Sequence, residues 1–296
     1  MLRIGTRGSR LAIAQARIVA DGLQVHGVQT ELVPLHTRGD AISARAPRGS
    51  GAAPDGQFTR ELEAALLDRR VDAVVHSYKD LPIAPVPGLV IGAVLERADA
   101  RDCLLTADGG GLDDLPFGGR IGTSSPRRAA QLAVARADLI AVPMRGNVET
   151  RIARLRAGEY DAIVLAAAGL DRLGIPVPAD ARLPFDLILP APAQGALAVQ
   201  ARSDDATVLT VLDRLDHQPT HVASDTERAL LSRIGGGCLA ALGAHASVDG
   251  STIRLRAALE DGAGTFRRAE ATGQLTDREA LVDAVASALL ELAAAS

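Results

Sequence analysis

The sequence predicts an α/β protein with two similar lobes joined by hinge crossovers, followed by a small C-terminal α+β domain. Three observations predict this fold class. The first part of the chain reads strand, helix, strand, helix, strand twice over, two short segments connect the copies, and three contiguous strand-like runs occur near the C-terminus. Strands that alternate with helices indicate parallel sheets, whose ligand cleft lies at the carboxyl ends of the strands.

The first copy starts with a short strand that runs into Ile4, Gly5, Thr6, Arg7, Gly8 and Ser9. Its later elements follow from the spacing of apolar residues. They are a helix at Leu11–Leu23, a strand at Glu31–His36, a helix at Thr59–Asp68 and a strand at Val71–Val75. The segment Ala41–Gln57, rich in Gly, Ala, Pro and Ser, has no equivalent in the second copy, so we interpret it as a mobile flap.

The second copy repeats this order at similar spacing. It comprises strand Arg120–Ile121, helix Ala129–Ala137, strand Leu139–Met144, helix Glu149–Ala157 and strand Tyr160–Val164. Pro126 suits a first helical position in the turn before the first of these helices. Two similar copies predict two similar lobes.

Two connections are expected between the lobes, at Glu96–Arg101 and at Leu189–Gly195, after which Leu197–Ala201 returns to the first lobe as a strand. Paired crossovers form a hinge. The predicted division assigns residues 1–96 and 196–215 to the first lobe, 101–190 to the second, and 218–296 to the C-terminal domain.

The C-terminal domain begins near Gln218. Ser224–Glu227 has the spacing of a capping box before a helix at Arg228–Ile234. Three strand-like runs follow, at Ala244–Val248, Thr252–Leu259 and Thr265–Ala271. The last two are separated by a hairpin turn at Glu260–Gly264, and an amphipathic helix at Asp277–Leu292 ends the domain.

Composition excludes several function classes. The chain has 296 residues, 47% of them hydrophobic, which is ample for real cores. A formal net charge of −4 and 2% aromatic residues argue against a nucleic-acid binder. Leu2–Ala20 carries four arginines, so we expect no signal peptide or membrane span, and a cytoplasmic location. Cys103 and Cys238 lie far apart, so neither a disulfide framework nor a metal site is expected.

Two arginine-bearing turns dominate the middle of the chain, Gly122–Arg128 and Arg145–Arg151. Each follows an apolar strand and opens a helix, so both place guanidinium groups beside helix N-termini, where backbone N–H groups and the helix dipole favour anions. Arginine forms bidentate hydrogen bonds with carboxylate and phosphate groups, so a small molecule with several anionic groups is the expected substrate. The alternative is two capped helices with solvated arginines.

A lysine and a carboxylate follow the strand Val71–Val75. The sequence there is His76, Ser77, Tyr78, Lys79, Asp80, which puts Asp80 at the strand end where α/β sites form. Asp80 is the best acid/base candidate, since a carboxylate can protonate a leaving amine and stabilise the cation that remains. The alternative is a strand-end turn with an exposed Lys–Asp pair. His76 is expected to be a structural hydrogen-bonding residue.

Cys238 follows three glycines, Gly235 to Gly237, which allow a tight turn that presents the thiol on an exposed loop facing the cleft. Cys103 lies in the apolar segment Asp102–Leu105 and fits a buried small hydrophobic residue.

Seven motifs in order resemble the hydroxymethylbilane synthase family, also called porphobilinogen deaminases. The resemblance runs from Arg3 to the C-terminal helix. The motifs are Thr37–Asp40, His76–Pro82, Gly122–Arg128, Arg145–Arg151, Ala168–Gly174, Pro192–Gly195 and Gly236–Cys238. The resemblance implies two periplasmic-binding-protein-like lobes and a transferase that condenses four porphobilinogen molecules, with loss of ammonia, onto a covalent primer and releases linear hydroxymethylbilane for haem synthesis.

The resemblance also implies residue roles. Cys238 resembles the thiol that forms a thioether to the dipyrromethane cofactor, and Asp80 resembles the catalytic carboxylate. The other implied contacts are to cofactor or chain carboxylates from Lys79, Ser125, Arg127, Arg128, Arg145 and Arg151, and to incoming substrate from Arg7, Ser9, Gln15 and Arg172. No metal is implied, porphobilinogen is the expected partner, and a monomer is the expected state.

The flap departs from the family pattern. Family members often have lysines and several glycines there, whereas this chain has Arg45, Arg48, Gly51, Asp55 and Gly56 and no lysine, so flap contacts are not carried over. Two other classes stay open. A solute-binding protein would explain the arginines alone but requires neither Asp80 nor Cys238, and an anion-dependent regulatory domain lacks a recognisable DNA-binding helix pair.

Overall fold

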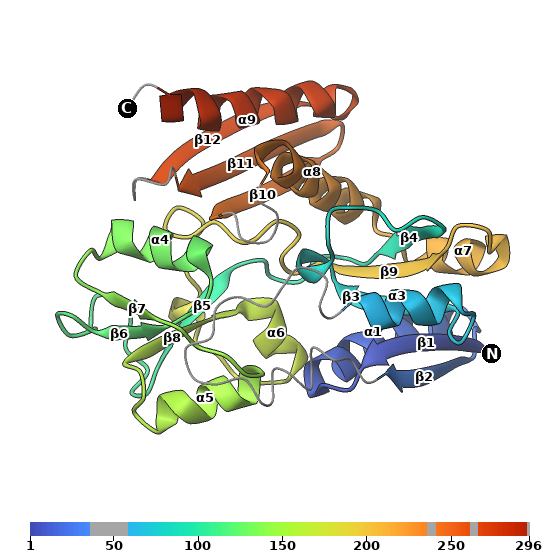
Figure 1. Cartoon of the computed structure of the whole chain (residues 1–296), viewed down its shortest axis with the longest axis horizontal. Coiled ribbons are helices and arrows are strands. Elements are labelled where there is room, and N and C mark those ends of the chain that lie inside the picture. Colours follow the sequence, from blue (N-terminus) through green and yellow to red (C-terminus); the bar gives the residue numbers. More distant parts are fainter. Residues whose placement is uncertain (36–58, 236–240, 261–265, 295–296) are drawn as a thin grey trace.

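The computed structural model of the chain describes residues 1–35, 59–235, 241–260 and 266–294. Its secondary structure forms three sheets with flanking helices (Figure 1). The predicted flap Ala41–Gln57, the motif Thr37–Asp40 and Cys238 lie outside the described residues.

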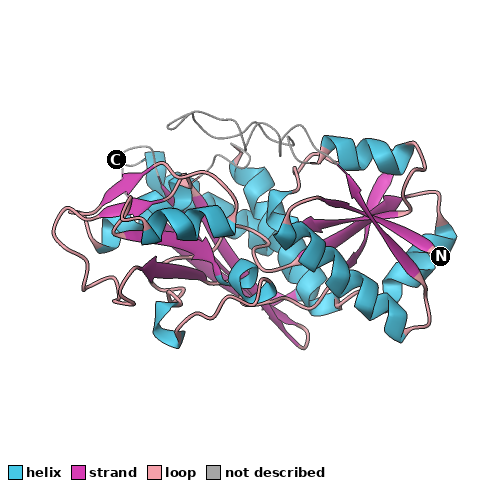
Figure 2. Ribbon diagram, turned by 90° about the horizontal axis from the view of Figure 1, so that it is seen from below, coloured by secondary structure: helices cyan, strands magenta, loops and turns pink. Residues whose placement is uncertain are grey.

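The first lobe is a five-stranded sheet in the order β2-β1-β3-β9-β4. Its strands are β1 (Leu2–Arg7), β2 (Thr30–Leu35), β3 (Ala73–Ser77), β4 (Leu89–Val94) and β9 (Leu197–Arg202), and its helices are α1 (Arg10–Val25), α3 (Arg60–Leu67) and α7 (Ala206–Leu212). Helices lie on both faces of the sheet (Figure 2). Ala73 and Val75 pack with α1 and α7, and Val74 between them packs with α3, as the two-residue period of a central strand requires.

The prediction of parallel sheets is correct for β1, β2 and β3 but wrong for β9, which pairs antiparallel with both β3 and β4. The reason is the direction of the second crossover. It enters the lobe beside the carboxyl end of β3, where the Tyr78 amide donates to the Ala196 carbonyl at 3.1 Å, so β9 runs back along β3.

The second lobe is a four-stranded sheet in the order β5-β8-β6-β7, with β5 antiparallel to β8 and the other neighbours parallel. Its strands are β5 (Asp102–Thr106), β6 (Arg120–Gly122), β7 (Ile140–Val142) and β8 (Ala162–Ala166), and its helices are α4 (Pro126–Ala135), α5 (Val148–Arg156) and α6 (Ala167–Arg172). The repeated strand–helix order thus produces two related α/β lobes, as predicted.

The C-terminal domain has an antiparallel sheet of β10 (Leu242–Asp249), β11 (Thr252–Glu260) and β12 (Phe266–Gln274), packed against α8 (Gln218–Ile234) and α9 (Arg278–Ala294). The predicted hairpin turn Glu260–Gly264 lies almost wholly outside the described residues, although Glu260 and Phe266 pair across it. The α/β plus α+β fold class is confirmed; the predicted domain boundaries stay a prediction.

The capping-box prediction was wrong. Helix α8 begins at Gln218 and is capped by His217, whose side chain accepts from the Thr220 amide. Ser224 and Glu227 lie in the middle of the helix and are fully buried. A three-residue spacing also places two side chains on one face of a helix interior, so the pattern did not identify a helix start.

The two crossovers lie against each other. Gly195 has φ +91°, and a Cβ there would lie 2.5 Å from the Ala98 carbonyl oxygen of the other crossover. The Ala98 amide donates to the Gly195 carbonyl at 3.3 Å. Only glycine combines that backbone conformation with so close an approach.

Glu227 ties both crossovers to the C-terminal domain. Its Oε1 lies 2.6 Å from Nη1 of Arg97 on the first crossover and accepts from the Ala246 amide of β10 at 2.6 Å. Its Oε2 accepts from the Ala193 amide of the second crossover at 2.6 Å. The carboxylate is fully buried, so these bonds replace its lost hydration.

We predict that Glu227→Gln lowers the free energy of unfolding by about 3–5 kcal/mol, because the variant leaves Arg97 without its charge partner and turns an NH₂ group toward a backbone N–H. Urea denaturation measures the change. The control is Glu279→Gln, which removes an exposed partner of Arg233 and is expected to cost less than about 1 kcal/mol. Equal small losses in both variants would contradict this role of Glu227.

Candidate active site

The first arginine turn begins helix α4. Ser125 is its N-cap, accepting from the Arg128 amide at 3.4 Å, and Pro126 is the first helical residue, as predicted. The following arginines, Arg127 and Arg128, are only 4% and 7% exposed. They are therefore not the solvated arginines of the simple capped-helix alternative.

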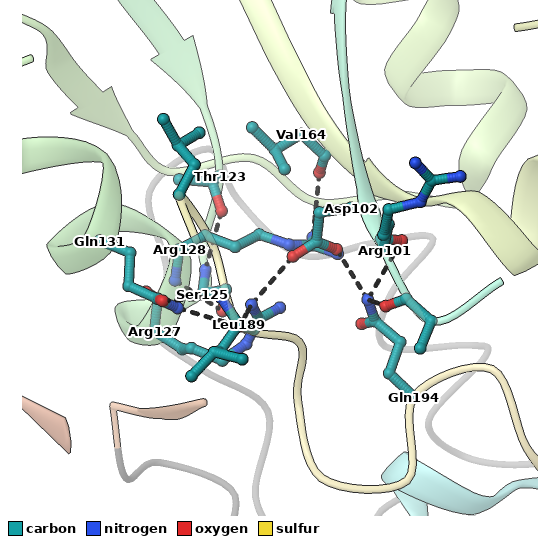
Figure 3. A network of polar contacts seen from close by, with 12 residues as sticks. Arg101, Asp102, Thr123, Ser125, Arg127, Arg128, Gln131, Val164, Leu189 and Gln194 are labelled. Atoms are coloured by element: carbon teal, nitrogen blue, oxygen red, sulfur yellow. Dashed lines mark hydrogen bonds and ion pairs between the residues drawn. The ribbon is translucent and has the colours of Figure 1, made fainter. Parts of the chain in front are cut away.

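Both guanidinium groups contact one carboxylate, Asp102, the first residue of β5 (Figure 3). Nη1 of Arg127 lies 2.9 Å from Oδ2, and Nη2 of Arg128 donates to Oδ1 at 2.6 Å. Asp102 is fully buried. Burial opposes its charged form, but Arg127 and Arg128 outweigh burial and hold the pKa of Asp102 well below its usual range.

The same cluster reaches the second crossover. Arg127 Nη1 donates to the Leu189 carbonyl at 2.6 Å, and the Gln194 amide Nε2 donates to Asp102 Oδ1 at 2.9 Å and to the Ala100 carbonyl at 2.8 Å. Gln194 Oε1 in turn accepts from Lys79 Nζ of the first lobe at 3.2 Å. One hydrogen-bonded chain therefore joins the arginine turn, both crossovers and the end of β3.

Lys79 and Asp80 occupy a single turn of 3-10 helix, Tyr78–Asp80, directly after β3. Asp80 is exposed, whereas Lys79 is half-buried. Burial lowers the pKa of Lys79 to about 8, although the nearby Asp80 partly offsets that effect. The pair is thus not the fully solvated Lys–Asp pair of the alternative reading.

Helix α8 holds this turn from the C-terminal domain. Arg228 donates to the carbonyls of Leu81 at 2.8 Å and Pro82 at 2.7 Å, and more weakly to that of Tyr78 at 3.3 Å. Its guanidinium also lies 4.5 Å from the centre of the Tyr78 ring, whose hydroxyl donates to Asp225 at 2.6 Å. The backbone that carries Asp80 is therefore fixed by a neighbouring domain.

The second arginine turn is capped by Asn147, which accepts from the Thr150 amide at 2.8 Å. Arg151 Nε donates to the Gly146 carbonyl at 2.8 Å, and burial lowers the pKa of Arg151 to about 10, with Arg128 acting in the same direction. Asp80 opposes the shift, so Arg151 lies within electrostatic reach of the turn after β3. Arg145 is half-buried, and no other described residue forms a hydrogen bond or ion pair with it.

Arg172, at the end of α6, donates through Nη2 to the Gly195 carbonyl at 2.6 Å. Burial lowers the pKa of Arg172 to about 10. Neither Arg151 nor Arg172 donates to a carboxylate within the part of the chain that the structure describes. Both side chains are half-buried, and half-buried cations that donate to no carboxylate are candidate sites for an anionic ligand.

The predicted substrate residues of the first lobe lie at the carboxyl ends of β1 and β3. Arg7 ends β1, Ser9 caps α1 by accepting from the Ala12 amide at 3.2 Å, and Gln15 Nε2 donates to Ser77 at 2.8 Å. The structure thus gives Ser9 and Gln15 local structural partners.

His76 and Cys103 behave as expected from sequence. His76 Nε2 lies 3.1 Å from Gln200 Oε1, and burial lowers the pKa of His76 to about 4, so the ring is neutral at pH 7. Cys103 is fully buried, and burial raises the pKa of its thiol to about 11.

Among the predicted site residues, Lys79 lies within electrostatic reach of Asp80, Arg127 and Arg128, and Arg151 lies within reach of Arg128 and Asp80. Sequence reasoning missed the groups that organise them, which are Asp102, Gln194, Glu227 and Arg228. For Asp102 a signal existed, because a carboxylate at the head of an apolar strand is seldom buried without a partner. The described residues hold no group of three or more metal-ligating side chains and no helix long and apolar enough to cross a membrane.

Comparison with known protein families and with individual proteins gives the same family in both cases. Residues 2–210 match the family described as "Porphobilinogen deaminase, dipyromethane cofactor binding domain", and residues 222–291 match "Porphobilinogen deaminase, C-terminal domain". The porphobilinogen deaminase of Roseiflexus sp. (strain RS-1) is 44% identical over 292 residues, covering 98% of this chain and 96% of its own. That of Corynebacterium efficiens is 42% identical over 302 residues, covering 100% and 98%.

Among solved structures, an ABC-transporter periplasmic substrate-binding protein from Coxiella burnetii aligns with 77% of this chain and 97% of its own, at 16% identity and a TM-score of 0.44. At that score the likeness adds nothing to the fold, which stands on the sheet order described above.

Fold and site together define a two-lobed α/β enzyme whose buried cations suit a carboxylate-rich small molecule. The chain belongs to the porphobilinogen deaminase family. It is a transferase of tetrapyrrole synthesis that acts on porphobilinogen with a dipyrromethane cofactor.

We predict that Arg228→Ala lowers kcat about 10- to 100-fold with KM changed less than about threefold, because the turn carrying Asp80 loses its anchors while the arginines stay in place. Steady-state kinetics of porphobilinogen consumption measure both constants. Arg233→Ala, at an exposed position on the same helix, is the control and should leave kcat unchanged. A rise in KM with unchanged kcat would show that Arg228 serves binding instead.

Proposed function

We propose that the described residues divide the deaminase reaction between one carboxylate, which handles protons and positive charge, and a set of cations, which hold the pyrrole carboxylates. The observation that carries this proposal is the chain of contacts that joins the buried Arg127 and Arg128, through Asp102 and Gln194, to Lys79 beside Asp80. The covalent attachment of the cofactor at Cys238 is part of the proposal, and rests on the resemblance of that motif because Cys238 lies outside the described residues.

The donor set fits a dipyrromethane group. Arg151 and Arg172 are half-buried and donate to no carboxylate of the described residues, and the buried Nε of Arg128 has no hydrogen-bond partner there. Each pyrrole ring carries an acetate and a propionate, which need such donors when desolvated. When bound, the dipyrromethane group supplies the free α-carbon on which the chain is extended.

Asp80 is proposed as the catalytic acid. An exposed carboxyl at a strand end can donate a proton to the departing amine of porphobilinogen. Once ionised, it stabilises the positive charge that develops on the substrate's pyrrole nitrogen. Arg228 and Tyr78 keep the backbone of this turn in place while the proton moves.

The proposed carboxylate holders are Lys79, Ser125, Arg127, Arg128, Arg145 and Arg151 for the cofactor, and Arg7, Ser9, Gln15 and Arg172 for the substrate. They come from both lobes, and Lys79 and Arg172 contact the second crossover directly, through Gln194 and Gly195. We infer that the chain grows between the lobes and that four condensations precede release of hydroxymethylbilane.

A reducing compartment suits this chemistry, because Cys238 must be a free thiol before the cofactor is attached. We therefore propose that the enzyme acts in the cytoplasm. We also propose a monomer, since the two lobes and the C-terminal domain complete one another within a single chain through Gln194, Glu227 and Arg228. Light scattering should give a mass near 30.6 kDa.

Intact-mass measurement tests the function directly. Purified protein is expected to carry an adduct of two linked pyrroles that is absent from Cys238→Ala. Asp80→Asn should keep the adduct but lose about 10²- to 10⁴-fold in kcat, the usual contribution of a positioned acid. A protein without pyrrole that leaves porphobilinogen unconsumed would overturn the proposal.

The pH dependence of cofactor attachment tests the role of Lys79. Its pKa of about 8 keeps the ammonium charged below pH 8 and neutral above it, so formation of the dipyrromethane adduct by the apoprotein should slow as the pH increases through about 8. In Lys79→Arg the cation persists, so this loss of rate should disappear. An identical loss of rate in both proteins would assign the titration to another group.

A further inference from the structure

The strongest unexplained group is the buried carboxylate of Asp102. It is fully buried, and it begins β5 immediately after the first crossover. Isolating a carboxylate from water costs several kcal/mol unless good partners surround it. Two hydrogen bonds and an ion pair do so here: Arg128 and Gln194 donate to Oδ1 at 2.6 and 2.9 Å, and Arg127 lies 2.9 Å from Oδ2 (Figure 3).

We propose that Asp102 is a positioning residue, the internal counter-ion that holds Arg127, Arg128 and, through Gln194, Lys79 in one arrangement suited to a carboxylate-bearing pyrrole chain. This inference rests on the proposed function of those cations and adds to it the residue that organises them.

The arginines need such a counter-ion. Two guanidinium groups buried side by side repel each other in a medium that screens charge poorly. Asp102 contacts both and so allows them to stay close. It does not cancel the cluster, because three cations face one carboxylate and a formal charge of +2 remains on these four side chains.

Donors remain for a ligand. Arg128 uses Nη1 for the Val164 carbonyl at 2.9 Å and Nη2 for Asp102, while its buried Nε has no hydrogen-bond partner among the described residues. A buried N–H without a partner is unfavourable until an acceptor arrives. A carboxylate of the pyrrole chain is an acceptor of the right charge.

The link to Lys79 extends the effect to the turn of Asp80. Gln194 is fully buried and bridges Asp102 to the Lys79 ammonium with bonds of 2.9 and 3.2 Å. The carboxylate favours the charged lysine, whereas the two arginines disfavour it. Asp102 thus stabilises a third cation that it does not touch.

The variant Asp102→Asn separates a positioning role from a simple effect of charge. It keeps the size of the side chain and raises the net positive charge of the cluster by one. If net charge alone governed binding, the variant would bind pyrrole carboxylates faster than wild type. If Asp102 positions the cations, binding becomes slower despite the extra positive charge.

The test uses full-length apoprotein expressed in cells that make no porphobilinogen. The purified protein is mixed with porphobilinogen, and intact mass follows the formation of the dipyrromethane adduct. For Asp102→Asn we expect adduct formation at least about tenfold slower than in wild type. We also expect the alkaline loss of adduct-formation rate to shift to lower pH, because Lys79 loses a carboxylate that favours its charged form.

Asp138→Asn is the matched control, because Asp138 also pairs with an arginine of the second lobe, Arg136, at 2.8 Å, away from the crossovers. It should load at the wild-type rate. If Asp102→Asn does not fold, Asp102→Glu provides the test. This variant keeps the negative charge but displaces it by one methylene group, and it should form the adduct at least about threefold more slowly than wild type.

Adduct formation in Asp102→Asn or Asp102→Glu at or above the wild-type rate would overturn the inference while leaving the deaminase function intact. Failure of the function itself gives a different result, since the wild type would then acquire no adduct at all.

Discussion

The structure depends on one buried ion cluster, in which Asp102 lies between Arg127 and Arg128 at the point where both crossovers meet the second lobe. The cluster connects the first turn of α4 to Leu189 and, through Gln194, to Ala100 and Lys79. Paired charges in a buried site are weak evidence for stability, but they fix orientation well. Here they fix the orientation of Arg127 and Arg128, the residues proposed to hold pyrrole carboxylates.

A second organising element comes from the C-terminal domain. Consecutive residues of α8 act on different parts of the site. Glu227 binds Arg97 of the first crossover and the Ala193 amide of the second, and Arg228 donates to backbone carbonyls of the turn that follows Asp80. The helix therefore places the crossovers and the turn of Asp80 relative to each other. If Asp80 is the acid proposed above, the C-terminal domain positions it through contacts that do not involve Cys238.

The sequence alone predicted the lobes because their signals are local and repeated. Apolar spacing within Leu11–Leu23 or Val71–Val75 needs no knowledge of distant partners. The antiparallel direction of β9 could not be predicted, since it depends on where the second crossover enters the lobe. The capping-box prediction at Ser224 failed because the same spacing suits a buried helix face.

The predicted site included the arginines of the first turn but not their counter-ion. Arg127 and Arg128 carry a recognisable motif, but Asp102 lies more than twenty residues earlier and Gln194 on another connection, so only the folded chain brings them together. Asp80 could be proposed from its position at the end of a strand. The contact of its turn with Arg228, 148 residues later in the sequence, could not be predicted, because no local pattern encodes a hydrogen bond from a helix to distant carbonyls.

The most direct test of a preformed cation site is a crystal structure of Cys238→Ala, which cannot attach the cofactor, compared with that of the loaded wild type. We expect the Asp102 carboxylate to lie within hydrogen-bonding distance of both Arg127 and Arg128 in the two structures. Guanidinium groups turned away from Asp102 in the cofactor-free protein, and ordered only by the ligand, would contradict the account.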